Sequence, residues 1–265
     1  IEYNEIYNNS YGSQTARCDY GVSIYEASGN IVRYNRIYNN YGGGIYVIAI
    51  DAHARNNRIY YNVIFENGKS IYEAQNKMGI RVGGNNDWDA DGTQIFNNVI
   101  YSNTLRQEVG ALHIGGGSGN IYVFNNILYN NDSIGFELFY SANQNDLSIG
   151  NNCYYRESGG YVVYFSGKLY DADHMIANTK TNYFYDWPED SGSIYADPLF
   201  SDVASFDLSL QKSSPCIDKG KNIGIEKDFT GSTVPAGILP DIGANEFSLS
   251  PLAPPQNIKM TKSSN

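Results

Sequence analysis

Residues 98–103 have the sequence Asn98-Val99-Ile100-Tyr101-Ser102-Asn103, and the same pattern recurs along the chain. Each copy has an asparagine, an apolar residue two positions later, an aromatic residue next, and a second asparagine two positions after that. The other full copies begin at Asn4, Asn35, Asn62 and Asn126, and a degraded copy begins at Asn152. The first asparagines are 26 to 36 residues apart. A strict motif on a loose period predicts one structural turn per repeat, with insertions between the fixed parts.

Two further apolar runs accompany each asparagine motif. One lies directly before it, at Ile31-Val32, Ile59-Tyr60, Ile95-Phe96, 121–124 and 147–149. The other begins each repeat, at 21–24, 44–47, 79–82, 111–114 and 135–138, and is apolar at its second and fourth positions. This alternation has the period of a β-strand. Three short strands per repeat predict an all-β parallel β-helix.

The first asparagines are expected to stack at a sharp bend. An amide side chain can accept a hydrogen bond from one coil and donate one to the next, and asparagine tolerates the left-handed backbone of a tight bend. This pattern resembles the pectate-lyase-like superfamily of right-handed parallel β-helices, in which an Asn ladder lies between the second and third strands. The resemblance covers residues 1–165 and implies the fold. It assigns no reaction.

Composition excludes several classes of partner. The chain has 265 residues, a formal net charge of −10, and 18 Lys and Arg against 28 Asp and Glu, which argues against nucleic acid. No apolar run has the length of a membrane span. The three cysteines, Cys18, Cys153 and Cys216, are odd in number and far apart in the sequence, so they predict neither a disulfide framework nor a metal site.

Three regions are expected along the chain. Residues 1–165 form the coils, 166–249 an irregular C-terminal capping segment, and 250–265 a Pro-rich linker. The middle region contains Ser214-Pro215-Cys216-Ile217-Asp218 and 241–247, and it resembles the choice-of-anchor segment of secreted bacterial β-helix proteins. The linker resembles the start of a fibronectin type III domain. Since residues 1–4 align with 32–35, inside a second strand, we expect a fragment of a larger secreted or surface chain, monomeric within a multidomain protein.

The third position of each first strand is expected to point outward. In four successive repeats this position holds Tyr46, Arg81, His113 and Glu137. Neighbouring strands lie about 4.8 Å apart, so the four would form one column on the sheet. Arg81 would bind a sugar carboxylate, His113 or Tyr46 would move a proton, and Glu137 would orient the histidine. The alternative is a solvated cross-strand ladder without function.

Two loops that follow first strands would form the rim of this site. One contains Asp51 and His53, and the other contains Trp88, a candidate platform for a sugar ring. The spacing of Asp87, Asp89 and Asp91 before Gly92 is that of a calcium loop, although Asn98 stands where the final glutamate is expected. The alternatives are a polar loop at Asp51 and His53, a tryptophan that covers the sheet, and a solvated acidic turn.

These observations predict a protein that acts on or binds an acidic, uronate-containing polysaccharide. The reaction expected is that of a lyase or epimerase, because both remove the proton next to the uronate carboxylate and need a neutraliser and a base. Arg81, with or without Ca²⁺, would neutralise the carboxylate. A non-catalytic glycan-binding or adhesin stalk is the first alternative. A glycoside hydrolase is the second, and it requires two carboxylates across the scissile bond.

Overall fold

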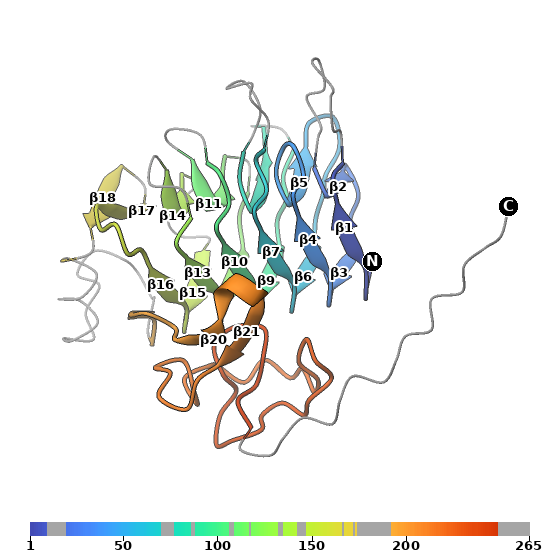
Figure 1. The fold of residues 1–265 in the computed structure, drawn as a ribbon. Coiled ribbons are helices and arrows are strands. Elements are labelled where there is room, and N and C mark those ends of the chain that lie inside the picture. The colour runs from blue at the N-terminus through green and yellow to red at the C-terminus, as the bar shows by residue number, and fades with distance from the viewer. Residues whose placement is uncertain are drawn as a thin grey trace, which may run out of the picture.

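The computed structural model describes residues 1–9, 20–69, 77–85, 88–105, 109–116, 118–131, 135–141, 147–165, 167–171, 173 and 192–248. It confirms the predicted fold, a right-handed parallel β-helix with three short strands per coil (Figure 1). The strands stack into three parallel sheets, which we call the first, second and third sheets in the order in which one coil, such as β2, β3 and β4, passes through them.

Each sheet collects one strand from each coil. The first sheet contains β2 (Val22–Tyr25), β5 (Ile45–Ala49), β8 (Ile80–Gly84), β11 (Gly110–Ile114), β14 (Phe136–Tyr140) and β17 (Tyr161–Phe165), and β18 (Lys168–Asp171) pairs antiparallel with β17. The second sheet contains β3 (Ile31–Arg33), β6 (Arg58–Tyr60), β9 (Gln94–Phe96), β12 (Ile121–Phe124) and β15 (Leu147–Gly150). The third sheet contains β1 (Glu5–Tyr7), β4 (Arg36–Tyr38), β7 (Val63–Phe65), β10 (Val99–Tyr101), β13 (Ile127–Tyr129), β16 (Cys153–Tyr155) and β19 (Ile194–Tyr195).

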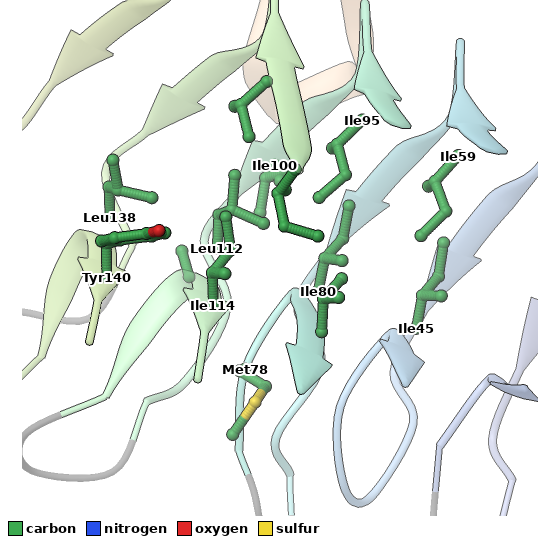
Figure 2. Packing of buried hydrophobic residues seen from close by; sticks show 14 of the residues in the cluster. Ile45, Ile59, Met78, Ile80, Ile95, Ile100, Leu112, Ile114, Leu138 and Tyr140 are labelled. Atoms are coloured by element: carbon green, nitrogen blue, oxygen red, sulfur yellow. The ribbon is translucent and has the colours of Figure 1, made fainter. Parts of the chain in front are cut away.

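The core of the coils is made of stacked aliphatic side chains. Ile80 and Leu112 of the first sheet point inward with Ile95 of the second and Ile100 of the third (Figure 2). All four are fully buried. Burying a side chain of this size stabilises the fold by about 1.5–3 kcal/mol. The period-two alternation of the sequence therefore directs every coil to contribute to one continuous core.

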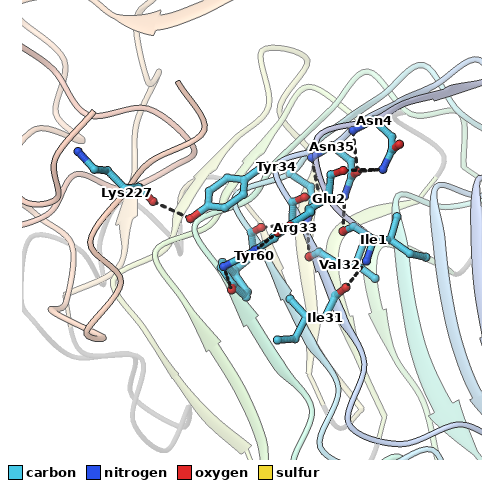
Figure 3. A network of polar contacts seen from close by, with 11 residues as sticks. Ile1, Glu2, Asn4, Ile31, Val32, Arg33, Tyr34, Asn35, Tyr60 and Lys227 are labelled. Carbon is cyan, nitrogen blue, oxygen red and sulfur yellow. Dashed lines mark hydrogen bonds and ion pairs between the residues drawn. The ribbon is translucent and has the colours of Figure 1, made fainter. Parts of the chain in front are cut away.

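The predicted Asn ladder is present. In each rung the backbone N–H and the Nδ2 of one asparagine donate to the Oδ1 of the next, as from Asn62 to Asn98 at 3.0 Å each. Figure 3 shows the first rung, from Asn4 to Asn35. Asn35, Asn62, Asn98 and Asn126 are all fully buried. We expected the ladder asparagine itself to have the left-handed backbone. The left-handed residue is instead the one before it, such as Tyr34, Tyr61 or Asn97.

The second asparagine of each motif forms another ladder at the next bend. Asn40, Asn67, Asn103 and Asn131 are joined in the same way, and a left-handed residue again precedes each of them. A short third ladder joins Asn30 to Asn57 at 3.0 Å. Each corner of the coil therefore has its own stacked amides. Side-chain amides satisfy buried backbone groups that the strands leave unpaired.

The C-terminal segment, residues 196–248, packs along the side of the coils. It contains β20 (Phe200–Asp202), the 3₁₀ turn η2 (Val203–Ser205) and β21 (Asp207–Leu210). Its apolar residues join a second cluster with outward-facing residues of the third sheet. The left-handed bend residues hold its backbone: Tyr34 donates to the carbonyl of Lys227 (Figure 3), and Asn97 and Asn125 donate to those of Gly243 and Lys221. We expected a cap at the coil end, whereas these contacts run along several coils.

Candidate functional site

The outer face of the first sheet carries one continuous column of side chains. The strand register pairs Ser23 with Tyr46, Tyr46 with Arg81, and Arg81 with His113. The next pairs are His113 with Phe139 and Phe139 with Tyr164. We call these six residues the outer column. Tyr46, Arg81 and His113 therefore lie where the alternation predicts, half-buried on one sheet face.

Most of the outer column is a stack of flat groups. Tyr46 stacks on Tyr20 with ring centroids 4.3 Å apart, and the Arg81 guanidinium lies over the Tyr46 ring at 5.3 Å. His113 stacks on Phe139 at 4.5 Å with an interplanar angle of 8°. Phe139 stacks on Tyr164 at 4.4 Å. Stacking fixes these side chains in one orientation, so their exposed edges are presented together along the sheet.

The prediction that Glu137 belongs to this column is wrong. Glu137 is fully buried, and Phe139 takes the place beside His113. The register pairs Leu112 with Leu138, so the motif at 135–138 is displaced by two residues from its apparent alignment. Glu137 directly precedes Leu138, as Gly79 directly precedes Ile80. It therefore lies at the start of β14, just after the bend where the chain enters the first sheet.

Beside this bend Glu137 terminates the second ladder. Its two carboxylate oxygens accept from the backbone N–H of Asn131 at 3.1 Å and from its Nδ2 at 2.6 Å. Arg156 lies behind it with Nε 3.3 Å from Oε1 and is itself 3% exposed. Burial raises the pKa of Glu137, and the charge of Arg156 opposes that shift. Glu137 is thus a structural residue of the coil, closed off from a ligand on the sheet face.

Glycines flank the charged part of the outer column. Gly83 and Gly115 follow Arg81 and His113 by two positions and point to the same side of the sheet. A Cβ added at Gly115 would lie 3.6 Å from Nε2 of His113, and one added at Gly83 would meet only backbone of Gly115 and Gly116. At Gly83 and Gly115 the three nearest contacts of such a Cβ come from backbone atoms and from His113 itself, so among the described residues these glycines leave space beside Arg81 and His113.

Rim residues from two loops are brought together as expected. His53 follows β5 and Trp88 follows β8, and their rings meet edge to face with centroids 4.9 Å apart. Asp89 holds His53 through an Oδ2–Nδ1 contact of 3.0 Å, and both of its oxygens are bound by Arg55. The Arg55 hydrogen bonds lower the pKa of Asp89. Asp51 is exposed and its backbone N–H donates to Glu26.

The expected calcium loop is only partly visible. Asp87 lies outside the described residues. Asp89 is occupied by Arg55 and His53, and Asp91 accepts the N–H of Gly119 at 2.6 Å. Within the described part of the chain, no three His, Cys, Asp or Glu side chains are grouped closely enough to hold a metal ion. Calcium remains a prediction, and Arg55 would compete with the ion for Asp89.

A polar pocket of about 540 Å³ lies on the other side of this rim. Arg55, Asp91 and Asn120 line it together with Gln94 and Tyr122 of the second sheet. The pocket is open and shallow, and its polar groups come from the same loops as the rim. It extends the polar surface from the first sheet toward the second.

Sequence reasoning missed three parts of the site. Phe139 and Tyr164 continue the outer column in the place given to Glu137. Tyr20 adds a ring at the other end. Arg55 neutralises Asp89, and its position two residues after His53 in the same loop was the available signal. For Phe139 the signal was ambiguous, since 138–140 are all apolar or aromatic.

Comparison with known proteins supports the repeat fold. The family model "Periplasmic copper-binding protein (NosD)" matches residues 1–96. The chain is 29% identical over 210 residues to the uncharacterized protein YwoF of Bacillus subtilis (strain 168). That match covers 65% of this chain and 40% of YwoF, so the chain spans less than half of that relative's length. Together with the three parallel sheets, these similarities support a β-helix repeat protein whose residues 1–96 are similar to that family.

Proposed function

We propose that this chain binds an acidic, uronate-containing polysaccharide along the outer face of the first sheet. The observation that carries the proposal is the register that aligns Tyr46, Arg81, His113, Phe139 and Tyr164 in one stacked column. Such a column runs across the strands, along the axis of the helix, and presents similar groups at each coil. A polymer of repeating sugars has a matching one-dimensional repeat.

The chemistry of the column suits uronate sugars. Aromatic edges and faces pack against the apolar faces of sugar rings, and an arginine binds a carboxylate through two parallel hydrogen bonds. Nε of Arg81 is buried and has no hydrogen-bond partner among the described residues. Its guanidinium is nevertheless held in place by the Tyr46 ring. The glycines beside Arg81 and His113 leave room for the sugar chain.

Lyase or epimerase chemistry is a second candidate for the same face. Arg81 and His113 occupy adjacent strands in direct register. Arg81 would neutralise the uronate carboxylate and so acidify the neighbouring C–H, and His113 would accept that proton. In a lyase the resulting carbanion expels the glycosidic oxygen, which leaves an unsaturated sugar that absorbs in the ultraviolet.

Other functions have less support from the described residues. A hydrolase needs two carboxylates across the bond, but Glu137 is buried and Asp89 is bound by Arg55 and His53. A non-catalytic glycan-binding or adhesin stalk uses the same outer column without turnover. The experiment below therefore separates binding from catalysis.

We place the protein in the periplasm or outside the cell. The similarity of residues 1–96 to a periplasmic family supports this location. No helix in the described ranges is long and apolar enough to cross a membrane. Copper binding, which that family's name mentions, is not carried over. In the matched region His53 is engaged by Asp89 and Met78 is fully buried in the core, and Cys18 lies outside the described residues.

A binding and absorbance panel tests this function. Polygalacturonate, alginate and hyaluronan are compared with neutral dextran by calorimetry, and each mixture is followed in the ultraviolet. We expect uronate-selective binding that Arg81→Ala weakens about 10–100-fold, since hydrogen bonds to charged groups contribute about 1.5–3 kcal/mol. Arg58→Ala on the second sheet is the matched control, because Arg58 is also half-buried and also lies over a tyrosine ring.

The outcomes are distinct. Equal losses in the two arginine variants, or equal binding of dextran, would contradict the proposal. If uronates are cleaved, His113→Ala should abolish the absorbance change and retain binding. Calcium is tested in the same panel: a melting temperature of metal-stripped protein that rises on calcium addition would support a site at Asp87, Asp89 and Asp91.

A further inference from the structure

Two buried thiols meet where the C-terminal segment packs on the coils. Cys153 is the first residue of β16, and its side chain points away from the helix interior into the second apolar cluster. Cys216 enters the same cluster from the C-terminal segment. Both side chains are fully buried. Burial and, after it, the neighbouring Cys216 raise the pKa of the Cys153 thiol, which places the two side chains close together in this cluster. The Cys153 thiol also donates to the carbonyl of Ala196 at 3.2 Å.

Backbone contacts on both sides fix this meeting point. In the third sheet Cys153 stands in register with Ile127, which itself stands in register with Val99. On the other side the carbonyl of Cys216 accepts the N–H of Ile242 at 3.0 Å. The next residue, Gly243, donates its N–H to Asn125 at 2.8 Å. The two cysteines are therefore brought together by the fold itself and not by a mobile loop.

Gly243 shows how closely the two parts approach. A Cβ added there would lie 2.6 Å from Cδ1 of Ile127, so only a glycine allows the segment to settle on the third sheet. Cys153 replaces the larger Ile127 one coil further on. The thiol thus occupies the position where an aliphatic side chain would otherwise fill the interface.

We propose that Cys153 and Cys216 form a disulfide bond that links the C-terminal segment to the last coil when the chain folds in an oxidising compartment. The oxidant is a small disulfide or a dithiol–disulfide protein. With glutathione disulfide, one cysteine thiolate attacks the S–S bond, forms a mixed disulfide and releases one glutathione. The second thiolate attacks the mixed disulfide, forms the Cys153–Cys216 bond and releases the second glutathione. Two cysteine thiols are oxidised and one disulfide is reduced.

The timing of the reaction follows from burial. Removal from water raises the pKa of the Cys153 thiol, so little thiolate exists in the folded protein. Neither sulfur is open to a bulky oxidant. The first attack on the oxidant therefore takes place during folding, before the segment closes on the third sheet, and closure brings the second thiol to the mixed disulfide. Folded reduced protein should oxidise slowly, whereas protein refolding in a glutathione buffer should oxidise readily.

Thiol counting on the parent chain tests the bond. The reduced, denatured chain is refolded in a glutathione redox buffer, denatured again, alkylated without reduction, and digested for mass spectrometry. We expect one alkylated cysteine, Cys18, and a linked pair of peptides that contains Cys153 and Cys216. Three alkylated cysteines, or a principal bridge that involves Cys18, would overturn the proposal.

Melting temperatures give a second readout that does not depend on glycan binding. The oxidised parent should melt about 5–15 °C above the same protein treated with reductant, because the bond closes a long loop of the unfolded chain. Cys18→Ser should keep this difference. Cys153→Ala and Cys216→Ala should each remove it. A parent whose melting temperature is unchanged by reductant would contradict the proposed bond, whatever the result of the glycan panel.

Discussion

The coils and the C-terminal segment satisfy their buried backbone groups in two different ways. In the coils a neutral amide does so: Asn98 accepts from Asn62 and donates to Ile59, Phe96 and Asn126. In the C-terminal segment carboxylates do so. Asp228 accepts backbone N–H groups of Thr230, Ser232 and Glu246, and Glu246 accepts those of Ala236 and Asp241.

This difference arises because the coils repeat and the C-terminal segment does not. In a stacked coil the residue above and the residue below are the same, so a side chain must both donate and accept, as an amide can. The C-terminal segment has no repeat, and around Asp228 and Glu246 its folded loops leave several neighbouring N–H groups to be satisfied. An ionised carboxylate accepts several of these. The consequence is that the stacked asparagines carry no titratable group, whereas the segment buries several.

Truncation of a central ladder residue should have the largest effect. Asn98→Ala removes the acceptor of two donors of Asn62 and the amide donor to the carbonyls of Ile59 and Phe96, all at a fully buried position. We expect the free energy of unfolding to fall by about 4 kcal/mol, since each orphaned buried group costs about 1–3 kcal/mol. Urea denaturation measures it. Asn4→Ala, in the same ladder but exposed, should cost less than about 1 kcal/mol.

An equal loss in these two variants would break the comparison. It would mean that the contribution of a ladder asparagine to stability does not depend on its burial. Asn98→Asp sharpens the test, because a carboxylate accepts but cannot donate to the carbonyls of Ile59 and Phe96. It should be at least as destabilising as alanine.

At Glu137 a fully buried carboxylate in the coils satisfies a backbone N–H group, as carboxylates do in the C-terminal segment. Glu137→Gln removes one acceptor from Asn131 and the charge partner of buried Arg156. The loss should be about 3 kcal/mol, because a buried arginine without its partner is costly. Denaturant midpoints of this variant and of the exposed control Glu157→Gln measure it. A neutral result for Glu137→Gln would show that the ladder does not need a charged end.

A smaller effect, of predictable sign, comes from pH. Burial raises the pKa of Glu246 to about 7 from an ordinary value of 4.5, and burial also raises those of Asp228 and Asp241. Between pH 4.5 and 7 the folded protein keeps a proton that the unfolded chain has released. Stability should therefore fall as pH rises through this window.

Hydrogen exchange at pH 5.5 and 8 locates this effect. After correction for intrinsic rates, protection should decrease with pH around 228–246, while amides beside Asn62 and Asn98 should be unaffected. Glu246→Gln should flatten the dependence. Equal pH dependence in coils and segment would contradict the assignment.

The repeated parts of the structure could be predicted from the sequence. The Asn motif predicted the strands and the stacked first asparagines, and the alternation placed Tyr46, Arg81 and His113 on one face. It failed at Glu137, because Gly135-Phe136-Glu137-Leu138 fits the repeat equally well in two registers that differ by two residues. A shift by two keeps the alternation, so periodicity cannot detect it. The partner that decides the register, Arg156, is close only in the folded chain.

The Asp89 network and the proximity of Cys153 and Cys216 could not be predicted from the sequence for the same reason. Asp89 reads as a calcium ligand in the sequence, and only the fold places Arg55 on both of its oxygens. The two cysteines are distant in the sequence and belong to regions with no common repeat. Contacts between a repeat and a non-repetitive segment depend on packing of the whole chain, which no local pattern encodes.

Footprinting by hydroxyl radicals tests the central claim, a polysaccharide site on the first sheet, most directly. The chain is oxidised with and without a uronate oligosaccharide, and side-chain modification is quantified by mass spectrometry. The account predicts protection of Tyr46, His113, Phe139 and Tyr164. Exposed Tyr7 on the third sheet should be modified equally in both samples. Protection of Tyr7 with no change in the outer column would contradict the account.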